Sequence, residues 1–356
     1  MSENPDLKGT SARAFHCARV ARAFSWIRPE PWGIHVVPAD CWIDPAHVVD
    51  RALITHGHAD HARGGHGQTF ATPETLAIMK LRYATSDGAV PVPYHETITL
   101  PGGVQATWIP AGHVLGSAQI LLEHAGERIL VTGDFKRRAD PTCPSFEVTP
   151  CDVFITEATF GLPVFRHPPT QHEIAKLTDA LAAEPERCVL VGAYALGKAQ
   201  RVIAELRAAG HVQTIWLHGA LEKMCRLYED FGVDLGALSL VSDAPSKEAM
   251  AGHVVLAPPS ALNDRWSRRL PDPLTAMASG WMRVRQRARQ RGVELPLIIS
   301  DHADWDELTR TVTQVAPRET WITHGREEAM LRWCELHQKK ARALALVGYE
   351  DEGGDD

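Results

Sequence analysis

The first half of the chain alternates short apolar runs with breaks at glycine and proline. Each run is short enough to form a single strand, as in HVVPA, CWIDP, ALITH, ATWIPAGH, QILLEH and ERILVTGDF. Their spacing predicts layers of sheet with functional loops between the strands.

From about Thr170 the pattern changes to an alternation of helices and strands. EIAKLTDALAAE and KAQRVIAELRAAG carry apolar residues at helical spacing, and CVLVGAYA and TIWLHG are typical of buried strands. This alternation predicts βαβ units and a parallel sheet. Strands and loops return in LPLIISDHADW and TWITHG, followed by a helix from Glu327. We therefore predict an α/β protein in which 170–292 is inserted between 1–169 and 293–356.

Composition fits a soluble enzyme, with 44% hydrophobic and 23% charged residues among 356. No apolar run approaches the roughly 20 residues that span a bilayer. The first residues lack the pattern of a secretory signal, so we expect a cytoplasmic protein with no membrane partner. The acidic end, EDEGGDD, predicts a solvated tail.

Seven cysteines, which include Cys17, are scattered and never spaced as C-x-x-C. This argues against a disulfide framework and against a cysteine-based zinc site. The net charge of -7 argues weakly against general polyanion binding, so contact with nucleic acid would need local basic patches.

Four potential metal ligands lie within six residues, directly after an apolar run: His56, His58, Asp60 and His61. A loop leaving a strand can turn the first two toward one ion and the last two toward a second. Two-metal hydrolytic sites hold their ions about 3.5 to 4 Å apart. A polar loop that is rich in histidine by chance is the alternative, and the spacing favours a metal site.

Three later apolar runs also end in a possible ligand beside glycine, at His113, Asp134 and His324. Each alone is more often a turn residue, but together they complete a site. Imidazoles and two carboxylates without thiolates predict two zinc ions, with manganese or iron as alternatives. We expect Asp134 to bridge the ions. The ions would lower the pKa of a bound water toward about 7 and so supply a hydroxide nucleophile.

With its His-x-His-x-Asp-His stretch from His56 to His61, the chain resembles the metallo-β-lactamase superfamily. The resemblance implies an αββα sandwich with two divalent metal ions. It also implies that Asp44 in WIDP orients the metal loop by hydrogen bonds, although a turn aspartate before proline is an equal alternative. The superfamily includes lactamases, thioesterases and glyoxalases as well as nucleases.

The 190 positions (324 − 134) between Asp134 and His324 resemble the β-CASP insertion of nucleic-acid hydrolases. Glu157 in TEATF is similar to the family's acidic motif A, His302 in SDHADW to motif B, and His324 to motif C. AYALGKAQ, with Lys198, resembles the turn that begins the β-CASP sheet. The resemblance implies a metallo-β-lactamase domain over 1–169 and 293–356 and a β-CASP domain over 170–292.

The segments WIDP, HADHA, SGWM and SDHADW resemble those of bacterial ligase-associated DNA exonucleases. This implies a DNA exonuclease of DNA repair that is functionally associated with a DNA ligase. Histidine at motif C instead matches RNA-processing members, whereas DNA-repair members often carry valine. An RNA processing or decay nuclease is therefore the alternative. The long insertion argues against a small-molecule hydrolase, and the complete ligand set argues against an inactive scaffold.

The catalytic residues that follow from these motifs are His302, Glu157, Asp60 and Asp134. The metal-bound hydroxide would attack phosphorus, and His302, held by Glu157, would protonate the leaving oxygen as general acid. A histidine satisfied within a turn is the alternative for His302.

Arginine occupies alternate positions in one stretch: Arg283, Arg285, Arg287, Arg289 and Arg291. Its planar fork suits phosphate, so we expect these residues and Lys198 to bind DNA or RNA. A solvated helix face is an equal alternative. Trp266 and Trp281 could stack on bases, although tryptophans at such spacing are more often core residues.

Overall fold

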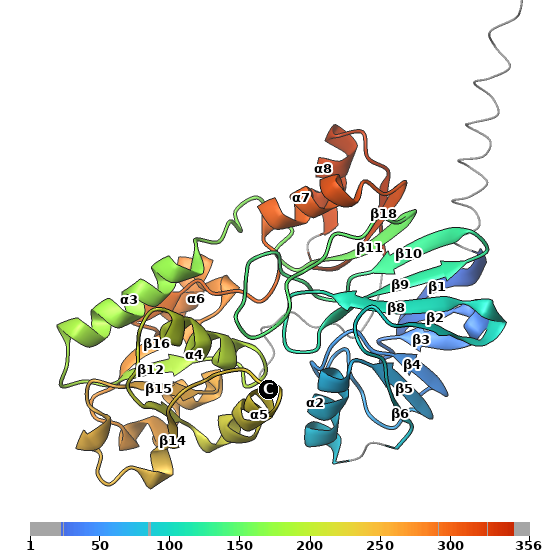
Figure 1. Cartoon of the computed structure of the whole chain (residues 1–356). Helices are drawn as coiled ribbons and strands as arrows, with labels where there is room; N and C mark the ends of the chain where they lie inside the picture. The colour runs from blue at the N-terminus through green and yellow to red at the C-terminus, as the bar shows by residue number, and fades with distance from the viewer. Residues whose placement is uncertain (1–22, 24, 85–86, 291, 326, 345–356) are drawn as a thin grey trace, which may run out of the picture.

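The computed structural model describes residue 23 and residues 25–84, 87–290, 292–325 and 327–344. Cys17, Arg291 and the acidic tail lie outside the described residues. The strands form three sheets (Figure 1). Two of them build a sandwich at the right of Figure 1, and the third forms a separate layered unit at the left.

The first sheet of the sandwich comes from the N-terminal part of the chain. Its strands pair in sequence order: β1 (Ile27–Glu30), β2 (Gly33–Val36), β3 (Cys41–Ile43), β4 (Arg51–Leu53), β5 (Gln68–Ala71) and β6 (Ala89–Pro91). The first three strands are antiparallel, and β3 to β6 are parallel. Helix α2 (Pro73–Tyr83) packs on the outer face through Met79, which lies in one apolar cluster with Ala52 and Ala71.

The second sheet joins the middle of the chain to its C-terminal part. Its order is β19 (Ala341–Ala343), β18 (Glu319–Gly325), β11 (Val153–Ala158), β10 (Glu127–Val131), β9 (Ala118–His124), β8 (Gln105–Pro110) and β7 (Thr97–Thr99). Strands β10, β11, β18 and β19 run parallel, so their carboxyl ends meet at one edge. Helices α7 (Trp305–Val315) and α8 (Glu327–Leu336) lie beside this sheet.

Alternation along the strands fills both faces of the second sheet. Ile155 and Trp321 point into the core between the two sheets, where they join Trp108. Their neighbours Phe154 and Ile322 point to the opposite face and pack in one cluster with residues of α7 and α8. The period of two along a strand therefore explains how one strand serves two apolar layers.

The third sheet lies in sequence between β11 and β18. It is wholly parallel, in the order β14 (Leu238–Leu240), β13 (Ile215–Leu217), β15 (Val254–Ala257), β12 (Val189–Gly192), β16 (Leu274–Ala278) and β17 (Leu295–Leu297). Its main helices are α3 (Thr170–Ala183), α4 (Lys198–Ala208) and α5 (Gly219–Asp230), with the short α6 (Arg285–Gln290) before β17. The predicted parallel sheet is confirmed.

The end of the inserted unit differs from the sequence prediction. The segment 293–356 was expected to belong to the first domain, but β17 pairs with β16 in the third sheet. A three-residue strand before a loop cannot be assigned to a sheet from its apolar pattern alone. We propose that the inserted unit ends after Leu297.

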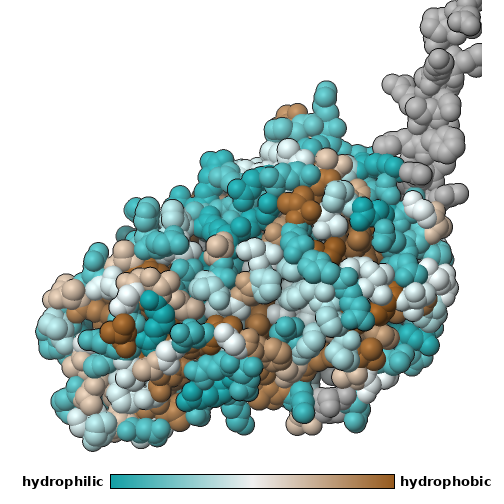
Figure 2. All heavy atoms as spheres, viewed as in Figure 1, coloured by the Kyte–Doolittle hydropathy of each residue, from teal (hydrophilic) through white to brown (hydrophobic). Residues whose placement is uncertain are grey.

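The surface view shows hydrophilic side chains interspersed with smaller apolar areas on this face (Figure 2). No helix of the described ranges is long and apolar enough to cross a membrane. All six cysteines that the structure describes are free: Cys41, Cys143, Cys151, Cys188, Cys225 and Cys334.

Candidate metal centre

The predicted ligands follow strand ends in both sheets of the sandwich. His56, His58, Asp60 and His61 lie in the loop after β4 of the first sheet. In the second sheet, His113 follows β8, Asp134 follows β10, and His324 lies near the end of β18. The edge where parallel strands end thus meets the loop from the opposite sheet, and this brings distant segments together.

One group of four side chains surrounds a position suitable for a metal ion. The ligand atoms of His56, His58, His113 and Asp134 all lie within 4.8 Å of one another. Asp134 Oδ2 lies 3.5 Å from His56 Nε2 and 3.8 Å from His113 Nε2. His113 Nε2 is 3.0 Å from His58 Nδ1. Three imidazoles and a carboxylate are a donor set that suits zinc.

A second group shares Asp134 with the first. It consists of His61, Asp134 and His324, again with ligand atoms within 4.8 Å of one another. The Oδ2 atom of Asp134 lies 3.4 Å from His61 Nε2, and Asp60 Oδ2 lies 3.7 Å from the same nitrogen. A single oxygen of Asp134 therefore faces both groups, which is the geometry that a bridging carboxylate needs.

His56 provides a direct test of whether these residues fit a cation. The Thr55 hydroxyl donates to Asp44 Oδ2 at 2.5 Å, so its oxygen accepts from His56 Nδ1 at 3.0 Å. This leaves a lone pair on His56 Nε2, which is buried and has no hydrogen-bond partner among the described residues. An unsatisfied buried polar atom is costly, and a bound cation would remove that cost. The side chains therefore fit divalent ions.

Asp44 orients this loop from outside both groups. Its Oδ1 accepts the Thr55 backbone N–H at 2.8 Å, and His61 Nδ1 donates to its Oδ2 at 2.8 Å. Its φ of 45° lies in the left-handed region, which aspartate tolerates better than most residues. These contacts hold His61 with Nε2 toward Asp134.

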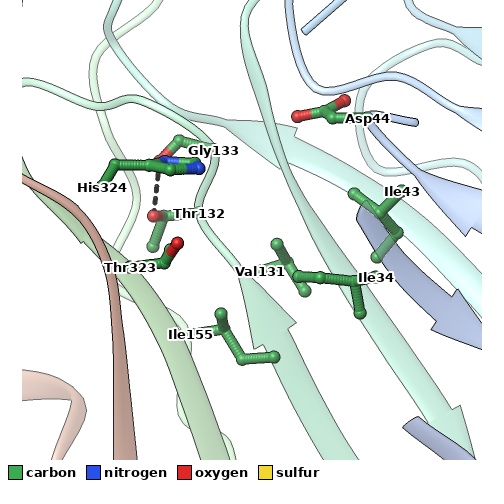
Figure 3. Close-up of a pocket in the computed structure, with 9 residues that line it drawn as sticks. All are labelled: Ile34, Ile43, Asp44, Val131, Thr132, Gly133, Ile155, Thr323 and His324. Atoms are coloured by element: carbon green, nitrogen blue, oxygen red, sulfur yellow. Dashed lines mark hydrogen bonds between the residues drawn. The ribbon is translucent and has the colours of Figure 1, made fainter. Parts of the chain in front are cut away.

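Asp44 and His324 also line a small cavity (Figure 3). Its volume is about 20 Å³, and the other walls are mainly apolar, with Ile34, Ile43 and Ile155 among them. His324 has a φ of 54°, so Asp44 and His324 both have left-handed backbone. Non-glycine residues in that region concentrate at functional sites because the surrounding structure must stabilise them.

Burial and neighbouring charges set the protonation of the ligands. Burial lowers the pKa of His56 and His113 well below the usual value, and it lowers the pKa of His324 to about 3. Burial alone would also lower the pKa of His61, but the carboxylates of Asp134 and Asp60 raise it well above its usual value. Three imidazoles are thus neutral at pH 7 and can donate lone pairs to a metal.

His302 and Glu157 form a third group with Asp134. His302 Nδ1 lies 3.0 Å from Glu157 Oε2 and 3.2 Å from its Oε1. Glu157 lies on β11, is fully buried and also accepts the Phe135 N–H at 2.7 Å. Burial raises the pKa of Glu157, although His302 opposes the shift. The structure thus brings this predicted pair together beside the ligands, and the ring of His302 lies 4.8 Å from that of His113.

The arginine stretch runs from the turn before α6 through the whole of this short helix. Arg283, Arg285 and Arg289 are exposed, while the guanidinium of Arg287 lies 4.0 Å over the ring of Trp281. The predicted Arg291 lies outside the described residues. Exposed side chains are compatible with phosphate contacts, which remain a prediction.

Burial argues against base stacking by Trp281, whereas the possibility stays a prediction for Trp266. Trp281 is buried, packs against Phe160 at 4.8 Å between ring centroids and has Arg287 over its ring. It is a core residue here. Trp266 is partly buried and its ring lies 4.5 Å from that of His218.

The prediction that Lys198 contacts nucleic acid is wrong, because its side chain is not exposed to solvent. It is fully buried at the first position of α4. Its Nζ donates to the Ile299 carbonyl at 3.1 Å and lies 2.9 Å from Asp301 Oδ2. A lysine held in this way cannot contact a nucleic acid.

The sequence predictions missed four other buried charged residues of the same region: Lys136, Asp140, Arg201 and Asp301. Asp301 stands directly before His302, and Lys136 follows Asp134 by two positions. Their position in the sequence next to predicted site residues could have indicated that they belong to the site. Their pairing depends on contacts between distant segments, which no local pattern shows.

The chain is similar in sequence to several known proteins. No family model matches the chain. "Probable DNA ligase" from Opitutus terrae is 31% identical over 310 residues, which cover 83% of this chain and 29% of that protein. "Endoribonuclease YSH1" from Mycosarcoma maydis is 31% identical over 243 residues, with coverage of 56% and 27%. "Cleavage and polyadenylation specificity factor subunit 3-I" from Arabidopsis thaliana is 25% identical over 389 residues, with coverage of 86% and 55%.

These similarities support the β-CASP metallo-β-lactamase family. The α/β fold is accordingly a metallo-β-lactamase sandwich with an inserted β-CASP sheet. The chain spans 29%, 27% and 55% of the three relatives, less than two thirds of each. A solved structure, a protein of unknown function from Enterococcus faecalis V583, shares the fold at a TM-score of 0.50 and 14% identity. It covers 78% of this chain and 75% of its own.

Proposed function

We propose that the chain is a metal-dependent nuclease that hydrolyses phosphodiester bonds with two divalent ions, zinc first among the candidates. The observation that carries the proposal is the shared position of Asp134, whose Oδ2 faces His56 and His113 on one side and His61 on the other. Adjacent ligand groups that share a carboxylate suit two-metal hydrolysis, in which the two ions lie about 3.5 to 4 Å apart.

The metal ligands divide between the two groups. His56, His58 and His113 would hold one ion, and His61 and His324 the other, with Asp60 beside the second group and Asp134 between them. When bound, two ions at such a site activate a water at neutral pH and neutralise charge on the phosphoryl oxygens.

His302 has the position of a proton donor. Because a carboxylate can only accept, the bond to Glu157 places a proton on His302 Nδ1 and leaves Nε2 as the ring atom that can protonate a leaving oxygen. The carboxylate also stabilises the charged imidazolium before proton transfer. In this proposal Glu157 keeps His302 oriented, and Asp134 stays ionised because His61 and His302 outweigh the effect of burial and lower its pKa.

RNA is the first candidate substrate. Relatives named "Endoribonuclease YSH1" and "Cleavage and polyadenylation specificity factor subunit 3-I" match the chain. His324 also belongs to the second ligand group, as the histidine at motif C of RNA-processing members would require.

DNA is the second candidate, favoured by one specific comparison. The relative named "Probable DNA ligase" covers 83% of this chain, more than the 56% covered by "Endoribonuclease YSH1". A DNA exonuclease of repair, associated with a ligase, would account for that match.

End-labelled RNA and DNA of one sequence, single- and double-stranded, distinguish these candidates when purified protein is assayed with and without chelator. The proposal expects metal-dependent cleavage of RNA, and the Asp134→Ala variant serves as the inactive control. Cleavage of DNA alone would transfer the proposal to the second candidate. A zinc-loaded protein that cuts neither polymer would contradict it.

A further inference from the structure

A buried network of charges connects the inserted unit to the candidate metal centre. It comprises three cations and three anions from three segments: Lys136, Asp140, Lys198, Arg201, Glu205 and Asp301. Their side chains are at most 8% exposed. Burial of an ion pair costs desolvation free energy, so such a pair is weak grounds for inferring added stability.

Three successive carbonyl groups of the segment before His302 are held by side chains, two of them by the network and the third by His113. Lys198 Nζ donates to the carbonyl of Ile299 at 3.1 Å, and the guanidinium of Arg201 donates to that of Ser300. The third carbonyl, that of Asp301, accepts from His113 Nδ1 at 2.7 Å. Two side chains of α4 thus fix the backbone that bonds a predicted metal ligand.

The bond between Asp301 and His113 has a definite chemical consequence. A carbonyl oxygen can only accept, so His113 Nδ1 must carry the proton. Its Nε2 then keeps the lone pair on the side of His58 and Asp134. Outer partners of this kind set the tautomer and ring orientation of a metal-binding histidine.

Lys136, another member of the network, contacts the backbone of the same histidine. Lys136 Nζ donates to the His113 carbonyl at 3.1 Å and to Asp140 Oδ2 at 2.5 Å. The start of α4 also touches this loop, because a Cβ at Gly197 would lie only 2.3 Å from Val114 Cγ1. Glycine at position 197 therefore lets the start of α4 pack against the His113 loop at a distance that a larger residue there would prevent.

We propose that Lys198 and Arg201 are positioning residues of the metal centre, acting through Asp301 on His113 and on the adjacent His302. The inference rests on the proposed function only in assigning His113 to the metal site. The packing of the inserted unit against the sandwich then affects the metal affinity of the centre, because α4 belongs to the inserted unit and His113 does not.

Direct zinc titration tests this without any nuclease assay. The variants to be compared are Lys198→Met, Arg201→Lys and the control Arg207→Lys, and circular dichroism would check that each is folded. Arg207 lies on the same helix and also donates to carbonyls, but those of His211 and Leu235 within the inserted unit. Loss of an outer partner costs roughly 10- to 100-fold in metal affinity. We expect a loss of about tenfold or more in Lys198→Met, a smaller loss in Arg201→Lys, and wild-type affinity in the control.

Arg201→Lys keeps the buried charge and so provides a readout if Lys198→Met does not fold. A lysine cannot replace the planar fork, whose Nη1 donates to Ser300 and Asp301 while its Nη2 donates to Thr170. Nitrogen-15 spectra of the metal-free protein should also show a single Nδ1–H tautomer of His113 in the wild type and a mixture in Arg201→Lys. Folded variants with wild-type zinc affinity and an unchanged tautomer would overturn the proposal. Weakened zinc binding in a protein that cuts no polymer would uphold it while the proposed nuclease function fails.

Discussion

His61 donates a hydrogen bond from Nδ1 to Oδ2 of Asp44 at 2.8 Å, across 17 positions of the chain. The Nε2 atom of the same ring faces Asp134 at 3.4 Å. Asp44 therefore determines which nitrogen of His61 can bind a metal. A carboxylate behind a histidine ligand is a recurrent arrangement in zinc sites, where it also raises the basicity of the ligand.

Asp44→Asn should weaken metal binding at the second group by roughly 10- to 100-fold, because an amide has one acceptor oxygen and cannot replace both carboxylate oxygens, of which one accepts from the Thr55 N–H and the other from His61. Asparagine tolerates the left-handed backbone, so the fold should persist. Zinc titration checks the result, with the exposed Asp40→Asn as control. Unchanged affinity at both sites would remove Asp44 from the metal centre.

His302→Ala should reduce kcat by about 10²- to 10⁴-fold while the metal content stays at the wild-type value, because a general acid contributes to rate and not to the ion cage. Asp134→Ala, in contrast, should lose metal. Elemental analysis beside steady-state kinetics makes the comparison. A metal-depleted His302→Ala protein would make His302 a ligand instead.

Replacing the three exposed arginines, Arg283, Arg285 and Arg289, with glutamine should flatten the salt dependence of polynucleotide binding. Each lost phosphate contact lowers the slope by about 0.7 for single strands and about 0.9 for duplexes. Arg287 is left in place because it lies over Trp281. Hydrolysis of a minimal phosphodiester should continue at the wild-type rate. An unchanged slope would show that the stretch is only a solvated face.

His324 should make the stability of the metal-free protein depend on pH. Its pKa is lowered from 6.5 to about 3, so between these values the unfolded chain binds a proton that the folded chain does not. Stability should therefore fall as the pH drops from about 6.5 toward 3, by at most about 1.4 kcal/mol per pH unit for this group. As the pH falls through this window, the free energy of unfolding of His324→Ala, measured by chemical denaturation, should rise relative to that of the wild type. The exposed His47→Ala is the control, and parallel curves for His324→Ala and wild type would refute the expectation.

The sequence predicted the parts of the fold and site that depend on local pattern. Parallel strands end at one edge, so ligands such as His113 and Asp134, each at the end of an apolar run, could be expected to meet. The parallel third sheet also followed from the alternation of helices and strands, which the pairing of β12 with β15 and β16 confirms.

Contacts between distant segments could not be predicted in this way. Lys198 follows a turn and precedes an amphipathic helix, a position that suits a phosphate contact as well as a buried ion pair. Only the packing of α4 against the segment before His302 shows that Lys198 forms an ion pair with Asp301. The assignment of β17 to the third sheet depends likewise on its partner strand and not on its own three residues.

Diffraction from crystals of the zinc-loaded protein, recorded at the zinc absorption edge, would locate the ions of the proposed two-metal centre. We expect two anomalous peaks about 3.5 to 4 Å apart, with Asp134 Oδ2 between them. One peak should lie among His56, His58 and His113, and the other beside His61 and His324. A single peak, or peaks away from Asp134 in a catalytically active protein, would contradict the two-metal centre.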